Sequence, residues 1–165
     1  MVSIGPTVDS TEALMDIRLK TVRSHVQASW DRPVKSDFGA LYKACHEEIR
    51  ERAAALWDSR IPMMIQAYFE DMETILRGLR LRAQDNASVW LVVSTSAYGG
   101  VEVPVDLILA QIGIRLGWSL REVGVLRNLR SSSQHVKNVE KAESKSIPLR
   151  ESVVIFDANS RRKAQ

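Results

Sequence analysis

The segment Val89-Trp90-Leu91-Val92-Val93 decides the fold, because it is the clearest strand signal in the chain. It is an uninterrupted apolar run with three β-branched residues, and the polar residues Gln84-Asp85-Asn86 precede it. Such a run is typical of a strand that is buried on both faces inside a sheet. We therefore expect it to be an interior strand with a neighbour on each side.

The residues after this strand predict the last part of an α/β sheet. The small residues 94–100 indicate a loop, and Pro104 begins a helix that ends at Gly117. Residues 118–129 alternate as a long strand, and residues 149–156 form a last strand. Between these two strands the chain is polar and has no periodicity. Residues 87–157 are thus expected to form strand, helix, strand and strand, the last two as an antiparallel hairpin.

Helical spacing dominates the chain upstream of the first strand. Apolar residues recur at three- and four-residue intervals through residues 11–83, which predicts three helices. The first begins near Glu12 and ends between residues 23 and 29, the second follows a cap at Ser36 or Asp37, and the third begins near Ser59 or Arg60. Residues 1–10 are expected to be a loose lead-in and residues 158–165 a basic tail. All 165 residues fit one domain.

Composition narrows the class of protein. The chain is 45% apolar and 26% charged, which is ordinary for a folded globular protein, and its net charge of +3 permits contact with DNA without requiring it. The single cysteine, Cys45, excludes an internal disulfide and suits the reducing cytoplasm, where we expect the protein to reside. The sequence contains no apolar run of 18 residues, so we expect no membrane-spanning helix. The three histidines have no ligand partners at metal-binding spacing, so no metal site is expected.

Several short motifs in the correct order resemble one known family. They are Tyr68-Phe69-Glu70-Asp71-Met72, the loop Ser94 to Val101, the helix start Val103-Pro104-Val105-Asp106 and the run Leu149 to Val154. Over residues 15–157 the chain resembles the C-terminal half of class I S-adenosylmethionine-dependent DNA methyltransferases, which modify adenine N6 or cytosine N4. The resemblance implies a partial Rossmann-like methyltransferase fold with about three sheet strands and three preceding helices.

Two motifs of that family are missing from this sequence. Family members bind S-adenosylmethionine on a glycine-bearing turn after the first strand, and the only Gly-Gly pair here, Gly99-Gly100, follows the segment that resembles the fifth strand. They also carry an Asp/Asn/Ser-Pro-Pro-aromatic tetrapeptide at the catalytic loop, whereas all five prolines of this chain stand singly. We therefore assign neither catalytic nor cofactor-binding residues to the chain. S-adenosylmethionine is its cofactor by resemblance only.

The loop after the Trp90 strand is the first candidate binding site. Open α/β sheets bind ligands beyond the carboxyl ends of their strands. The resemblance places Ser94, Ser96 and Tyr98 beside the substrate pocket, where the Tyr98 ring would border or stack on a base. The alternative is a tight turn in which small residues only connect strand and helix.

Basic and polar residues in two further places are candidates for DNA contact. Arginine and hydroxyl groups make most contacts to phosphates, and glutamine recognises adenine edges. The candidates are Arg127, Arg130, Ser132 and Gln134 around the end of the long strand, and Arg23 and His25 near the first helix. A solvated loop without a ligand is the alternative in both places.

These observations leave two functional hypotheses open. In the first, the chain is a portion or subunit of a site-specific DNA methyltransferase, and a second chain or missing sequence supplies the cofactor and catalytic loops. In the second, it is a non-catalytic nucleic-acid-binding or scaffold protein that retains half of the methyltransferase fold. Either way the Trp90 strand lacks its usual inner neighbour, so an apolar sheet edge should be exposed unless a partner chain, self-association or a covering helix closes it.

Overall fold

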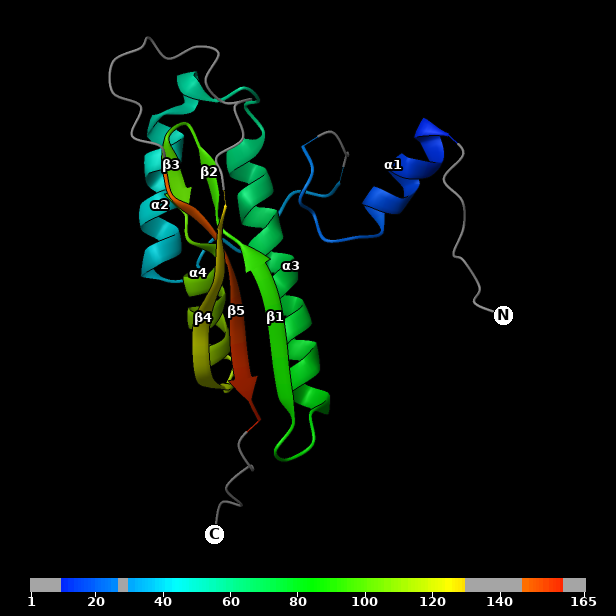
Figure 1. Cartoon of the computed structure of the whole chain (residues 1–165). Helices are drawn as coiled ribbons and strands as arrows, with labels where there is room; N and C mark the ends of the chain where they lie inside the picture. The colour runs from blue at the N-terminus through cyan, green and yellow to red at the C-terminus, as the bar shows by residue number, and fades with distance from the viewer. Residues whose placement is uncertain (1–9, 27–29, 130–146, 159–165) are drawn as a thin grey trace.

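The structure, a computed structural model, describes residues 10–26, 30–129 and 147–158. In the described residues the first half of the chain is helical, and the second half carries the strands with one helix among them (Figure 1). In chain order the elements are α1 (Thr11–Leu19), α2 (Ala40–Glu51), the 3-10 turn Ala53–Ala55, α3 (Ile61–Arg82), β1 (Ser88–Ser94), β2 (Ser96–Tyr98), β3 (Val101–Val103), α4 (Val105–Arg115), β4 (Ser119–Leu129) and β5 (Leu149–Asp157). Mixed α/β class and three helices ahead of the main sheet are as predicted.

The main sheet has the strand order β1-β5-β4. β5 runs antiparallel to both neighbours, which makes β1 and β4 parallel to each other on either side of it. The chain passes from β1 to β4 through the β2/β3 hairpin and α4, and then returns as β5 between the two strands. The predicted antiparallel pairing of the last two strands is confirmed.

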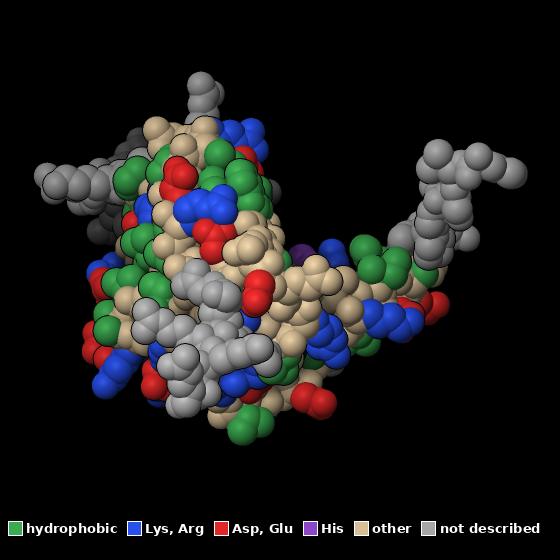
Figure 2. All heavy atoms as spheres, turned by 90° about the horizontal axis from the view of Figure 1, so that it is seen from below, with side chains coloured by type: hydrophobic (Ala, Val, Ile, Leu, Met, Phe, Trp, Pro, Cys, Tyr) green, Lys and Arg blue, Asp and Glu red, His purple; other side chains and the backbone are tan. Residues whose placement is uncertain are grey.

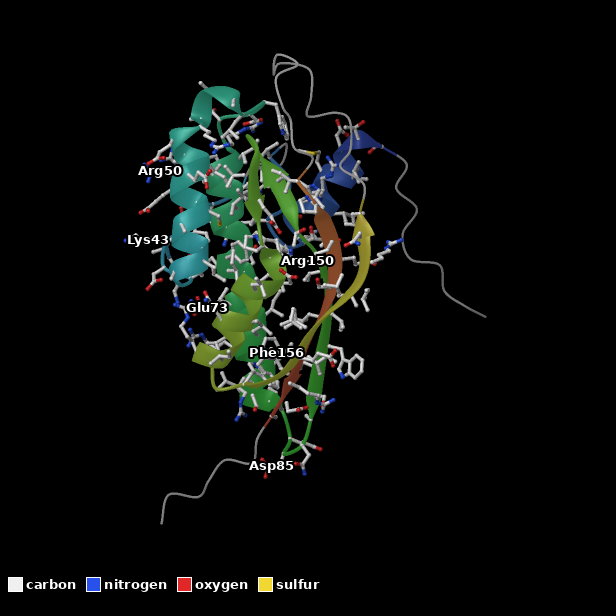
Figure 3. All side chains as sticks on the ribbon, turned by 60° about the vertical axis from the view of Figure 1, so that its left-hand side comes forward. Lys43, Arg50, Glu73, Asp85, Arg150 and Phe156 are labelled. Carbon is white, nitrogen blue, oxygen red and sulfur yellow. The ribbon has the colours of Figure 1, made fainter. Side chains whose placement is uncertain are left out.

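Helices cover one face of this sheet. α4 packs on all three strands and α3 packs on α4, so the core lies between the helices and the face of β5 that carries Val154 and Phe156. Figure 3 shows Phe156 on the helix side of β5. Trp118, just before β4, is buried and its indole N–H donates to the Leu76 carbonyl of α3 at 3.1 Å. This contact ties the longest helix to the edge strand β4.

The interior position expected for the Trp90 strand is wrong for the described residues. β1 lies at the edge of the sheet and pairs only with β5, and its side chains alternate between the core and solvent. Trp90 and Val92 are 62% and 60% exposed because no described helix covers their face of the sheet. Within the described part of the chain, the expectation of an exposed apolar sheet edge is confirmed.

The segment 94–100, expected to be a plain loop, contains most of a β-hairpin. β2 pairs antiparallel with β3, and Gly99 and Gly100 form the turn between them. Both glycines have positive φ angles, 57° and 77°, which a two-residue hairpin turn of this kind requires and side chains disfavour. The Gly-Gly pair is therefore a hairpin signal that the expectation of a loop overlooked.

The helix boundaries differ from the predictions mainly at the N-terminal side. α1 ends at Leu19, before the predicted residues 23–29, and it has no buried residue. Figures 1 and 2 show it projecting from the body of the molecule. α2 begins at Ala40 because Gly39 adopts a φ of 110°, and the Asp37 carboxylate accepts from the Gly39 N–H without capping the helix itself. Cys45 is buried on α2, as predicted.

None of the helices in the described ranges is both long and apolar enough to cross a membrane. Most of the lead-in 1–10, most of the basic tail 158–165 and the polar segment 130–146 lie outside the described residues.

Candidate functional site

A pocket of about 240 Å³ opens at the carboxyl end of β1. α3 forms one wall, and the β2/β3 hairpin with the start of α4 forms the other. The lining residues are Ser24, Met64, Ile65, Tyr68, Phe69, Ser94, Ser96, Tyr98, Val103 and Val105. Its volume is below the roughly 300–1,000 Å³ of pockets for drug-sized ligands, so it suits a group about the size of a single base or side chain.

Helical spacing explains the α3 wall. Met64 and Tyr68, and likewise Ile65 and Phe69, are four residues apart and therefore lie on one side of the helix. Phe69 is fully buried and its ring meets the Tyr42 ring edge-on, with centroids 5.6 Å apart. This packing fixes the base of the wall.

Hydroxyl groups and half-buried tyrosines make up the polar part of the pocket. Burial raises the pKa of Tyr98, which a hydrogen bond with Ser96 partly offsets, and burial raises the pKa of Tyr68 to about 12. Both phenols are therefore protonated at neutral pH and available as donors. Among the described residues, the lining holds no carboxylate, imidazole, amine or guanidinium group. The described lining can accommodate a flat, neutral, hydrogen-bonding group, and its residues include neither an acid–base pair nor a nucleophile beside a base.

Arg23 holds the segment that brings Ser24 to the pocket. Its guanidinium lies 2.6 Å from an oxygen of Asp71 and 2.6 Å from an oxygen of Glu70, both on α3. The Arg23 backbone N–H also donates to Asp71 at 2.8 Å. The hydrogen bonds to Asp71 are the main reason why the pKa of Arg23 is raised. Arg23 is thus engaged in a structural clamp.

Glu70, which belongs to the same clamp, should make the free energy of unfolding depend on pH in the acid range. Burial opposes ionisation of Glu70, but the N–H of Lys35 at 2.8 Å, the Arg23 guanidinium and the N–H of Val34 at 2.9 Å outweigh it, so the pKa of Glu70 lies below 4.5. We expect Glu70→Gln to cost about 2 kcal/mol near neutral pH, because charge-assisted hydrogen bonds are lost.

The pH dependence has a defined sign. As the pH falls through 4.5, the unfolded state takes up the Glu70 proton before the folded state does, so this contribution to stability is present above 4.5 and is lost below it. The difference in free energy of unfolding between wild type and Glu70→Gln should therefore shrink in acid. Urea titrations at several pH values measure it, and a difference that does not change with pH would contradict the assignment.

A buried ionic cluster stabilises the opposite wall of the pocket. Asp106, at the start of α4, is fully buried and accepts from the Arg150 guanidinium at 2.8 and 3.0 Å. These bonds are the largest cause of the raised pKa of Arg150, which also donates to Glu102 of β3 at 2.9 Å. The Arg150 N–H donates to the Thr95 hydroxyl at 3.0 Å, directly after β1. β1, β3, α4 and β5 therefore meet at one residue, which Figure 3 shows on the helix side of β5.

The residues predicted to contact DNA are not brought together. Arg127 pairs with Glu151 across β4 and β5 at 2.8 Å, and Arg23 is bound to α3 as described above. His25 is exposed, one residue from Ser24 of the pocket. Arg130, Ser132 and Gln134 lie outside the described residues. Where the described residues form the face seen in Figure 2, basic and acidic side chains are interspersed.

Ser94, Ser96 and Tyr98, by contrast, all line the pocket. None of the α3 residues of the pocket was assigned to a site from the sequence, because the apolar spacing of this helix predicts only a buried stripe. These residues are Met64, Ile65, Tyr68 and Phe69. Ser24 was not assigned either. The signal for Ser24 was its position beside Arg23 and His25, which were selected for their charge.

The double-glycine turn of this chain does not fit S-adenosylmethionine. The only double-glycine turn is already packed: a Cβ on Gly99 would lie 3.2 Å from Leu56, and one on Gly100 would lie 3.3 Å from the Arg52 guanidinium. No open backbone cradle for a nucleotide remains at this turn. Within the described ranges, no three His, Cys, Asp or Glu side chains are grouped so as to hold a metal ion.

Comparisons of this chain with protein-family models, with curated proteins and with solved structures gave no match.

Proposed function

We propose that this chain is a portion or subunit of a DNA amino-methyltransferase that holds the target base in the pocket at the end of β1. The methyl group would pass from S-adenosylmethionine to a base amino group. A second polypeptide, or sequence outside residues 1–165, would supply the cofactor turn and the catalytic tetrapeptide, because these residues carry neither.

One observation carries the proposal. The three residues selected from the β1 loop, Ser94, Ser96 and Tyr98, line one pocket together with the Tyr68 ring of α3. An enzyme that modifies a base inside a duplex must move that base out of the stack into a pocket, where aromatic rings and hydrogen bonds hold it. The two tyrosines and the serine hydroxyls supply both kinds of contact for a neutral heterocycle.

The proposal assigns a limited role to this chain. Since the two protonated phenols are the only ionisable groups among the described lining residues, these residues orient the base. The Arg150–Asp106 cluster holds the wall formed by the hairpin and α4 together, and the Arg23 clamp holds Ser24 beside the α3 wall. Chemistry at the amino group depends on the second polypeptide or on the missing sequence.

Titration with deoxyadenosine and deoxycytidine, followed by NMR, tests the pocket directly. We expect weak binding with shifts at Ser94, Ser96 and Tyr68, and we expect Tyr98→Ala to weaken it about tenfold, since stacking of a base on an aromatic ring is worth about 1–3 kcal/mol. Trp57→Ala is the matched control, because Trp57 is 58% exposed and does not line the pocket. Shifts elsewhere, or equal losses in the two variants, would refute a base-binding pocket.

Calorimetry with S-adenosylmethionine tests the division of roles. The chain alone should give no binding heat. Addition of a polypeptide that carries a glycine turn and a Pro-Pro-aromatic motif should produce both cofactor binding and methylation of DNA. Tight binding of S-adenosylmethionine by this chain alone would overturn the proposal.

A nucleic-acid-binding scaffold is the second candidate, and the described residues favour it less. Arg23 and Arg127 are neutralised by carboxylates, so neither is a free cation for a phosphate. DNA affinity that falls steeply with salt, without any nucleoside binding, would favour this candidate over the first.

A further inference from the structure

The free edge of β1 differs from the other edge of the same sheet. Among the described strands β1 pairs only with β5, so alternate backbone N–H and C=O groups of residues 88–94 point away from the sheet without a strand partner. The segment contains no charge and no proline, and its register with β5 has no bulge. β4, at the opposite edge, carries Arg121, Glu122 and Arg127 and has two register shifts. Natural proteins use such charges and bulges to prevent edge pairing, and β1 has none of them.

Two antiparallel copies of β1, centred on Leu91, would have compatible residues opposite each other at every position. In Ser88-Val89-Trp90-Leu91-Val92-Val93-Ser94, an antiparallel copy centred on Leu91 places serine opposite serine and valine opposite valine at the two ends. It also places Trp90 opposite Val92 twice. Aromatic and β-branched residues that face each other across strands stabilise a sheet, and no like charges meet.

The two faces of the strand also match in this arrangement. Trp90 and Val92 are on the exposed face, whereas Val89, Leu91 and Val93 are half-buried against the core. A twofold axis normal to the sheet keeps each face on its own side, so the apolar outer residues of both copies form one patch and the inner residues extend the core. A slip of one residue would place core-facing residues opposite solvent-facing ones.

We infer that two copies of this chain associate through β1, antiparallel and centred on Leu91, to form one sheet with three strands from each copy. The interface is isologous, because the same seven residues serve both sides. The pockets at the two Ser94 ends then lie at opposite ends of the joined strands. The inference does not depend on the proposed function, although a partner that adds a strand to β1 would compete for the same edge.

Sedimentation equilibrium between about 1 and 100 µM tests the association, since dimerisation must depend on concentration. The wild-type chain should shift from monomer to dimer, and Val92→Lys should raise the dissociation constant at least tenfold, because it places a charge opposite Trp90 of the other copy. Val125→Lys is the matched control: Val125 is 58% exposed on β4, at the far edge, and its substitution should leave the dimer unchanged. A wild-type chain that remains monomeric, or equal effects of the two lysines, would overturn the inference.

Cysteine crosslinking tests the register. Leu91 faces its own counterpart across the axis, so mild oxidation of Leu91→Cys should yield a covalent dimer. Ser88→Cys should not, because the two copies of residue 88 would be about 20 Å apart, six residues along the strands. The native Cys45 is buried and does not interfere. Crosslinking of Ser88→Cys, or its absence in Leu91→Cys, would exclude pairing about Leu91.

Discussion

Replacement of Asp106 by alanine is expected to lower the free energy of unfolding by about 3–5 kcal/mol, the usual cost of removing one partner from a buried ion pair. Asp106 is fully buried, and its carboxylate accepts from Arg150, from the Ser152 hydroxyl at 2.8 Å and from the Leu107 N–H at 2.9 Å. Without it, the Arg150 guanidinium retains only Glu102 as a charged partner. The hydroxyl of Ser152, which is also fully buried, loses the acceptor it has in the fold.

Urea denaturation followed by circular dichroism measures this loss, and two variants serve as controls. Glu102→Gln should cost less than about 1 kcal/mol, because Glu102 is 32% exposed and water replaces its contact. The double variant Asp106→Leu with Arg150→Met should recover much of the loss, since it removes both charges instead of leaving the Arg150 guanidinium without its buried partner. A small effect of Asp106→Ala, or a double variant whose cost is the sum of the single costs, would show that the cluster is not coupled in this way.

The Asp106 variant should also weaken nucleoside binding. The Arg150 cluster joins the starts of α4 and β5 to β3 and to the end of β1. Two pocket residues are next to members of this cluster in the sequence: Val103 follows Glu102, and Val105 precedes Asp106. Once that wall moves, the gap to the α3 wall is no longer defined. NMR titration of the folded variant fraction at low temperature separates this effect from unfolding.

Gly113→Ala is the second large prediction. A Cβ at Gly113 of α4 would lie 2.3 Å from two ring carbons of Phe156, which is fully buried. Because the ring is fully buried, either the ring or α4 must shift to relieve this contact. We expect a loss of about 3 kcal/mol, at the upper end of the usual cost of overpacking, despite the higher helix propensity of alanine.

Gly78→Ala in α3 is the matched control for this substitution. The nearest atom to a Cβ at Gly78 is the end of the flexible Arg82 side chain, at 3.7 Å. Alanine should therefore stabilise that helix by about 0.4–1 kcal/mol, opposite in sign to the effect at Gly113. Thermal and urea unfolding of both variants measures the contrast. Equal signs would mean that α4 does not approach the sheet as closely as described, and partial rescue of Gly113→Ala by Phe156→Val would support the contact.

The elements near β1 show how far local patterns predict this fold. The apolar spacing of α3, Pro62 in its first turn, and the apolar runs of β1 and β5 each specify an element by periodicity, and the structure has them within one or two residues of the predicted bounds. Burial on both faces of β1 was predicted wrongly. An apolar run such as Val89 to Val93 predicts a strand. It does not predict which strands lie beside that strand in the sheet, because these come from distant parts of the chain.

The candidate site was predictable only in part. Ser94, Ser96 and Tyr98 follow a strand directly, so strand direction places them at one edge of the sheet, and the pocket contains all three. Arg23 was selected for its charge, yet Asp71 neutralises it from 48 residues away in sequence. Spacing carries no information about such a distant partner.

The sequence by itself determined the α/β class, the antiparallel pairing of the last two strands and the absence of the glycine turn and the Pro-Pro tetrapeptide, because these depend on local periodicity or on residue identity. Only the tertiary structure decided which residues share a pocket, which arginines are already paired and which edge of the sheet is free. Those properties arise from contacts between segments far apart in the chain, and their energies depend on burial and distance that no local pattern specifies.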